Sequence, residues 1–121
     1  MEKFKKTLVI GVSENPSRIS NIALQRLIQN GHEVVAIGSK SGFIYDTPIL
    51  TNIPENLEVD TVTLYIRPEI QEKIKNELLS VKMKRLIFNP GTENPGLEKK
   101  AKIMGIITEN ACTLVLLSLE E

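Results

Sequence analysis

Residues Thr7–Ser20, with the sequence TLVIGVSENPSRIS, carry the clearest structural signal in the chain. Their first part, Thr7–Val12, is short, β-branched and almost wholly apolar, as is typical of a strand that helices cover on both faces. A helix is predicted over Ser20–Asn30, with Ser20 as its N-cap and Gly31 in the left-handed position after its end. The stretch therefore predicts a strand, a loop and a helix in succession, the opening unit of an α/β domain.

The rest of the chain repeats this alternation. Four more short apolar segments are predicted as strands: Glu33–Gly38, Asp60–Ile66, Arg85–Asn89 and Ile106–Thr108. Helices are predicted to begin at Pro68 and at Asn94-Pro95. The turn-rich residues 39–59 are predicted to be loops, with room for a short strand or helical turn. The apolar segment Thr113–Leu119 fits a strand and a terminal helix equally well.

This order predicts one domain over residues 1–121, a Rossmann-like three-layer α/β/α sandwich with a mostly parallel sheet of five or six strands. In such a sheet, ligands bind beyond the carboxyl ends of the strands, at the switch in strand order. The loops that follow the predicted strands are therefore the places to search for function.

Composition and charge narrow the range of functions. The chain has 15 Lys and Arg against 15 Asp and Glu, so no overall charge draws it to nucleic acid or to an anionic membrane. One cysteine permits no internal disulfide, and no apolar run is long enough for a signal peptide or a membrane span, so a cytoplasmic protein is expected. One histidine and one cysteine cannot build a zinc site, so no metal is expected.

The loop after the first strand is the strongest candidate for an anion site, because N–H groups and the helix dipole at its end attract negative charge. Gly11 allows a ligand to approach the backbone, and Arg18 offers a forked cation suited to phosphate. Ser13 and Ser20 supply hydroxyls. Ser13 and Pro16 stand where the dinucleotide fingerprint has its second and third glycines, so a standard nicotinamide motif is absent. An ordinary strand-to-helix turn with a serine cap is the alternative.

Ser39 and Lys40 follow the second strand, where nicotinamide enzymes usually carry an acidic residue for the ribose hydroxyls. This pair suits a phosphate on the ribose better than two hydroxyls. It therefore favours NADP or the 3′-phosphate of coenzyme A over NAD. A solvent-exposed lysine in a flexible loop is the alternative interpretation.

Two further loops lie at the same predicted edge. Arg67 stands where the third strand becomes a helix, and it either contacts a pyrophosphate or is a plain surface charge. Pro90 and Gly91 turn the chain after the fourth strand and are candidates by position, with structural use favoured over catalysis. No catalytic residue is predicted. His32 is expected on the surface, away from the ligand edge, and Cys112 is expected to be a small buried hydrophobe.

Taken together, these loops resemble the coenzyme A-binding domain family, small stand-alone proteins related to the nucleotide-binding domain of succinyl-CoA synthetase alpha subunits. The likeness runs from about Lys6 to Cys112. Its most specific part, Val9–Ser20, is similar to the family signature G-x-S-x-x-P-x-R-x-S. Supporting pieces are Asn30–Val34, Tyr65–Glu69 and Asn110 with Cys112.

The resemblance implies a Rossmann-type fold that binds coenzyme A, an acyl-CoA or a related nucleotide, with no catalytic activity of its own. The ligase relatives use a phosphorylated histidine from a further domain, so their activity is not expected here. Carried over by position, Gly11, Ser13, Arg18 and Ser20 would hold phosphates, Ser39 and Lys40 would face the adenosine end, and Arg67 would flank the pyrophosphate. The full set of candidate cofactor-binding residues is Gly11, Ser13, Pro16, Arg18, Ser20, Ser39, Lys40, Arg67, Pro90 and Gly91.

The chain departs from the family at two of these loops. Ser39-Lys40 replaces a common Asn-Pro, and Asn89-Pro90-Gly91 replaces a glutamine-containing strand end. Two alternative functions stay open: an NADP-binding small oxidoreductase or redox partner, for which no convincing acid or base is found, and a Rossmann-like interaction protein without a ligand. The unusually apolar tail after Cys112 predicts a homodimer surface.

Overall fold

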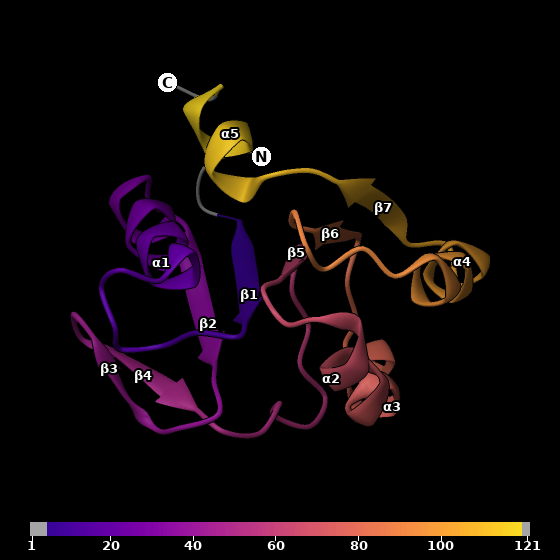
Figure 1. The fold of residues 1–121 in the computed structure, drawn as a ribbon, viewed down its shortest axis with the longest axis horizontal. Coiled ribbons are helices and arrows are strands. Elements are labelled where there is room, and N and C mark those ends of the chain that lie inside the picture. The colour runs from indigo at the N-terminus through magenta and orange to yellow at the C-terminus, as the bar shows by residue number, and fades with distance from the viewer. Residues whose placement is uncertain (1–4, 120–121) are drawn as a thin grey trace.

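A computed structural model describes residues 5–119, which form an α/β domain around one seven-stranded sheet (Figure 1). The strands are β1 (Lys6–Ile10), β2 (Glu33–Ile37), β3 (Gly42–Ile44), β4 (Thr47–Leu50), β5 (Thr61–Leu64), β6 (Arg85–Phe88) and β7 (Ile107–Asn110). The helices are α1 (Ile19–Gln29), α2 (Pro68–Lys73), α3 (Lys75–Ser80), α4 (Pro95–Ile103) and α5 (Thr113–Ser118). The Rossmann-like class is confirmed.

The sheet runs in the order β3-β4-β2-β1-β5-β6-β7, and its neighbours are parallel except for β3 and β4. β1 lies at the centre and pairs with β2 on one side and β5 on the other. A central strand covered on both faces contacts no solvent, which explains why TLVIGV is so apolar. The chain moves outward from β1 to β2 and later returns to place β5 on the opposite side, so the strand order switches at β1.

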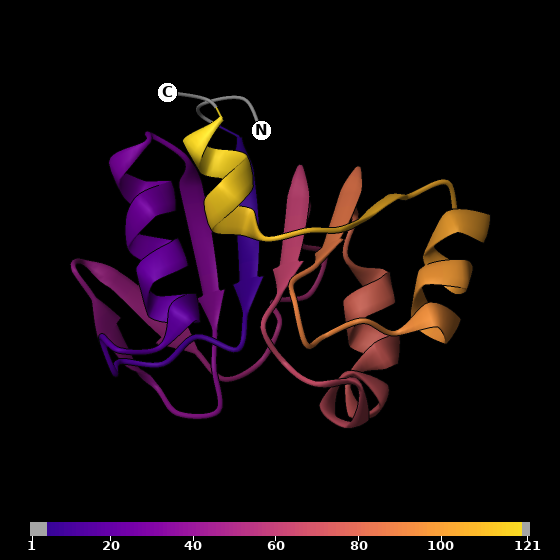
Figure 2. The same cartoon turned by 45° about the horizontal axis from the view of Figure 1, so that its top comes forward.

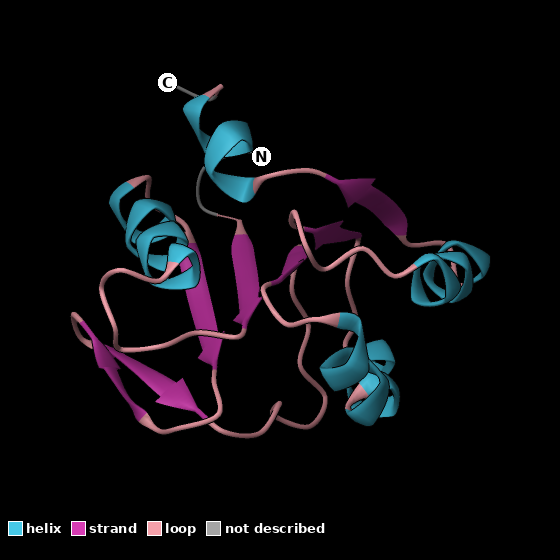
Figure 3. Cartoon of the chain, in the orientation of Figure 1, coloured by secondary structure: helices cyan, strands magenta, loops and turns pink. Residues whose placement is uncertain are grey.

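Alternate side chains of β1 build two separate cores. Leu8 and Ile10 pack with residues of β5, β6, α3 and α4, whereas Val9 packs with residues of α1 and α5. Leu97 of α4 and Leu24 of α1 are buried anchors on the two faces. The helices therefore form two layers with the sheet between them, as Figures 2 and 3 show. Both figures also show that α5 ends close to the side of the molecule where β1 begins.

The predicted number of strands, five or six, is wrong, because the sheet formed by residues 5–119 has seven. β3 and β4 form an antiparallel hairpin in the region expected to be mainly loop, and β4 then pairs in parallel with β2. Ile44 and Ile49 bury their side chains there. The turn between the strands is Tyr45-Asp46, with Tyr45 at a φ of 53°. It lacks the Asn-Gly or Asp-Gly pair that usually announces a hairpin, and Pro48 argues against a strand.

Two helix predictions also need correction. The apolar stripe after Pro68 predicts one continuous helix, but the backbone departs from helical geometry at Ile74 and separates α2 from α3. The predicted N-cap Ser20 is wrong as well. Arg18 occupies the cap position without a side-chain cap bond, and Ser20 is buried inside the first turn of α1. The undecided segment after Cys112 is helical, as α5.

His32 is not the surface residue that was expected. It is only 5% exposed, and its Nδ1 lies 3.3 Å from the carbonyl oxygen of Lys5. It directly precedes β2, at the opposite end of the strand from the predicted ligand edge. Packing between the end of α1 and the start of β1 buries the ring, and a helix-to-strand turn alone does not reveal such burial.

Candidate functional site

A cavity of about 890 Å³ opens at the carboxyl ends of β1, β2 and β5, at the point where the strand order switches. Three loops line it: the loop from β1 to α1, the loop from β2 to β3, and the segment from β5 into α2. Six of the ten candidate residues lie in its lining: Gly11, Ser13, Arg18, Ser20, Ser39 and Lys40. This is the position where ligands bind in open sheets of this type.

The loop from β1 to α1 is held in a defined shape by its own backbone. The N–H groups of Gly11 and Val12 both donate to the carbonyl oxygen of Ile37, at 2.8 and 2.9 Å. Gly11 has a φ of +103°, and a Cβ on it would lie 2.9 Å from the carbonyl of Tyr65. Only glycine fits this conformation and this approach to β5 without strain. Gly11 thus has a conformational role in the packing of the loop against Tyr65, while its predicted role in the approach of a ligand stays a prediction.

Hydrogen bonds from side chains complete the loop. The Asn15 N–H donates to the Ser13 hydroxyl at 3.1 Å, and the side-chain Oδ1 of Asn15 accepts from both the N–H and the hydroxyl of Ser17. The buried Asn21 donates from Nδ2 to the Ser13 carbonyl oxygen at 2.8 Å. Sequence reasoning missed Asn21, because an amide in the first turn of a helix gives no pattern that distinguishes it from a surface residue.

The charges of the cavity come from Arg18, Lys40 and Glu14. The side chains of Arg18 and Lys40 are exposed, and they form no ion pair or hydrogen bond with any other residue of 5–119. Ile19 and Ser20, in the first turn of α1, line the same cavity, so the N-terminal end of the helix dipole adds partial positive charge. An anionic ligand would find two unneutralised cations and a helix N-terminus together.

The other four candidates lie outside the cavity lining. Arg67 has a side chain that is 72% exposed, and its Nε lies 3.4 Å from the Glu69 carboxylate. Pro16 is exposed at the outer turn of the first loop. Pro90 and Gly91 are exposed in the turn after β6, where the Gly91 N–H donates to the Glu93 carboxylate at 2.8 Å. A bound ligand would have to extend beyond the cavity to meet them.

Apolar residues form the remaining wall of the cavity. Ile66, Ile70 and Ile74 follow β5 and run along α2. Ile70 and Ile74 recur at helical spacing after Pro68, a pattern that does not distinguish a pocket wall from a core face. A wall of this kind suits an uncharged, partly apolar part of a ligand.

Tyr65 lines the cavity but keeps its hydroxyl away from solvent. The hydroxyl oxygen is buried and has no hydrogen-bond partner within residues 5–119. Burial raises the pKa of the Tyr65 phenol to about 12. The nearby hydroxyls of Thr63 and Thr113 lie 2.7 Å apart and bond to each other instead. Tyr65 therefore stays a neutral phenol near pH 7.

Asn89 ties the carboxyl ends of β5 and β6 to the start of α5. Its Nδ2 donates to Thr63 Oγ1 at 2.6 Å and to the Leu64 carbonyl at 2.8 Å. Its Oδ1 accepts from the Thr113 N–H at 2.9 Å. Asn89 is thus fully used in joining β5, β6 and α5, so this departure from the family pattern has a structural role.

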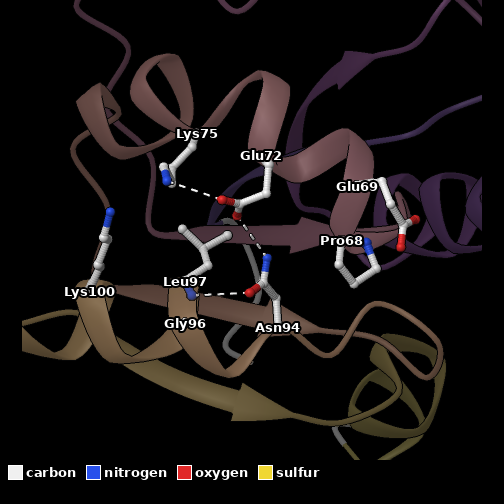
Figure 4. Close-up of a pocket in the computed structure, with 8 residues that line it drawn as sticks. All are labelled: Pro68, Glu69, Glu72, Lys75, Asn94, Gly96, Leu97 and Lys100. Atoms are coloured by element: carbon white, nitrogen blue, oxygen red, sulfur yellow. Dashed lines mark hydrogen bonds and ion pairs between the residues drawn. The ribbon is translucent and has the colours of Figure 1, made fainter.

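A second pocket of about 370 Å³ lies between α2, α3 and α4, and Figure 4 shows its residues. The Glu72 carboxylate accepts from Lys75 Nζ at 3.1 Å and from Asn94 Nδ2 at 3.2 Å, and these bonds lower the pKa of Glu72. Asn94 also caps α4 by accepting from the Leu97 N–H, and α4 begins at Pro95 as predicted. The polar groups here satisfy one another and hold the helices together.

A doubly wound sheet with a fixed loop and a cavity at its switch point places the protein in the Rossmann-like α/β class, in which ligands bind at this edge. The chain belongs to the coenzyme A-binding family: the model described as "CoA binding domain" matches residues 5–118. The resemblance seen in the sequence is confirmed. Among curated proteins, no match was found.

Solved structures show the same fold. A crystal structure of an uncharacterized protein is 43% identical, with a TM-score of 0.93 and 98% of each chain covered. A protein from Thermus thermophilus has a TM-score of 0.82 at 19% identity, with 96% of this chain and 89% of that chain covered. A conserved hypothetical protein from Pyrococcus furiosus has a TM-score of 0.73 at 24% identity, with 88% of this chain and 92% of that chain covered. In residues 5–119, no helix has the length and apolar character needed to cross a membrane.

Proposed function

We propose that this protein binds coenzyme A, free or acylated, in the cavity at the carboxyl edge, and that it has no catalytic activity of its own. The observation that carries the proposal is a pair of cations whose side chains have no partner within residues 5–119: Arg18 in the fixed Gly11–Ser20 loop and Lys40 in the loop after β2, which line the same cavity. Membership of the coenzyme A-binding family supports the choice of ligand.

Each part of the ligand has a suitable partner in the lining. The pyrophosphate would lie against Gly11, Ser13 and the first turn of α1, with Arg18 beside it. The 3′-phosphate would take Lys40 and Ser39. The pantetheine arm would lie along the apolar wall formed by Ile66 and Ile70, which follow β5.

Titration calorimetry with coenzyme A, 3′-dephospho-coenzyme A, NADP and NAD tests the proposal. Coenzyme A should bind more tightly than its dephosphorylated form, because only the former carries the phosphate assigned to Lys40. Absence of both heat and thermal stabilisation at millimolar coenzyme A would reject the proposal. Tighter binding of NADP than of coenzyme A would identify the alternative ligand.

Two variants separate the phosphate contacts. A charge-assisted hydrogen bond contributes on the order of 1.5–3 kcal/mol, so losing one weakens binding about tenfold or more. Arg18→Ala should weaken coenzyme A and its dephosphorylated form equally, since both carry the pyrophosphate. Lys40→Ala should weaken coenzyme A alone. Lys99→Ala is the matched control, because Lys99 is an exposed lysine of α4 outside the cavity lining. Equal effects of Lys40→Ala on both ligands would contradict the assignment.

A further inference from the structure

Glu14 presents a problem for an anion-binding cavity. It lies in the β1–α1 loop and lines the cavity together with Arg18 and Lys40, and it forms no ion pair with any residue of 5–119. An unpaired carboxylate beside bound phosphates would oppose their binding by like-charge repulsion. The contacts of Glu14 show what it does in that position.

The Glu14 carboxylate joins two of the loops that form the cavity. Its Oε2 accepts a hydrogen bond of 3.0 Å from the N–H of Phe43, at the start of the β3–β4 hairpin. Gly42 leaves the space that the carboxylate fills, because a Cβ on Gly42 would lie 2.6 Å from both carboxylate oxygens. The glycine and the glutamate therefore fit each other, and the hydrogen bond from Phe43 to Glu14 spans 29 residues of sequence.

This contact closes one end of the loop that carries Lys40. At the other end, the Gly38 N–H donates to the Leu50 carbonyl oxygen at 2.8 Å. Between these two anchors, Ser39, Lys40 and Ser41 are exposed and form no hydrogen bond within residues 5–119. The Lys40 backbone thus lies between Gly38 at one side and the start of β3 at the other, where pairing with β4 and the Glu14 bond to Phe43 both hold the chain.

We propose that Glu14 is a positioning residue, which fixes the Ser39–Ser41 loop by holding Phe43. In this position, Lys40 distinguishes ligands that carry a phosphate on the adenosine ribose from ligands that lack it. This inference rests on the proposed coenzyme A binding. It assigns Glu14 no direct contact with the ligand, and it explains why an acidic side chain occupies a site for anions.

The ratio of the dissociation constants of 3′-dephospho-coenzyme A and coenzyme A, measured by calorimetry, tests the role of Glu14. Glu14→Ala and Glu14→Gln both remove the charge, but glutamine keeps an oxygen that can accept from Phe43. Glu14→Ala should lower the ratio about two- to tenfold relative to Glu14→Gln, as expected for the loss of one hydrogen bond. Gly42→Ala should resemble Glu14→Ala. Glu55→Ala, at an exposed loop glutamate outside the cavity lining, is the control.

Hydrogen exchange on the protein without ligand provides a second readout. Amide exchange at Phe43 should be faster in Glu14→Ala than in Glu14→Gln, with the rest of the sheet unchanged. Equal selectivity ratios in these two variants, while the wild type binds coenzyme A, would overturn the inference and leave the proposed function intact. Failure of the wild type to bind coenzyme A would overturn both, and unchanged Phe43 exchange would show that the anchor itself is absent.

Discussion

Asn89 makes three hydrogen bonds with its single side-chain amide, and all of them are buried. Removing it would leave Thr63, the Leu64 carbonyl and the Thr113 N–H without this partner. Each unsatisfied buried polar group costs about 1–3 kcal/mol. The sequence places Asn89 correctly at the end of a strand but does not reveal this network, because its partners lie 24 to 26 residues away.

We expect Asn89→Ala to lower the free energy of unfolding by about 2–3 kcal/mol, measured by urea denaturation. Asn52→Ala, at an exposed asparagine, should change it by less than about 0.5 kcal/mol. Similar stabilities of the two variants would show that the Asn89 bonds are not structural.

Tyr65 should make the protein sensitive to alkaline pH. Its pKa in the folded protein is about 12, against 10.0 for the unperturbed phenol. The unfolded chain therefore releases the proton first, so the stabilising contribution is complete below pH 10 and is lost as the pH rises toward 12. Relative to Tyr65→Phe, the wild type should lose about 2 kcal/mol of stability over this interval. Urea denaturation at several pH values measures the difference, and a constant difference would contradict the burial of the phenol.

Among the connecting elements, the β1–α1 loop is the one most completely predicted from sequence. Gly11, Ser13, Arg18 and Ser20 were predicted because loops of this type bind anions at a helix N-terminus, and all four line the cavity, while their binding of a ligand stays a prediction. The β3–β4 hairpin was missed, since a turn of Tyr45-Asp46 shows none of the usual turn signals. The role of Glu14, which joins this loop to the hairpin, was also missed, because a contact between distant loops leaves no local pattern in the sequence.

Gly11→Ala should destabilise the protein by about 1–3 kcal/mol, because alanine at this φ is strained and its Cβ would press on the Tyr65 carbonyl. It should also weaken coenzyme A binding by displacing the loop. Gly96→Ala is the matched control. Gly96 lies in the first turn of α4, where the nearest atom to a new Cβ is 3.7 Å away, so its effect on stability should be neutral or slightly positive. Thermal denaturation of both variants distinguishes these outcomes, and equal melting temperatures would refute the strain argument.

The arrangement of the whole molecule follows from a few regularities in the sequence. Alternating apolar strands and amphipathic helices predicted the class, and the rule for open sheets predicted the edge at which the cavity forms. The predicted homodimer stays a prediction. Leu117 of the apolar tail is buried in the core between α1 and α5, which leaves Val115 and Leu119 exposed at 57% and 76%. Such burial depends on how α5 returns across the sheet, which periodicity alone does not show.

The return of α5 has a practical consequence. The start of β1 and the end of α5 lie near each other (Figure 2). The cavity opens at the carboxyl ends of the strands, which is the opposite end of the sheet. A fluorescent protein fused after α5 would therefore leave the cavity accessible. A short linker from α5 to β1 would permit circular permutation, with new ends placed in the exposed turn at Pro90-Gly91. With coenzyme A bound in the cavity as proposed, the domain would be a suitable starting point for a genetically encoded sensor of that ligand.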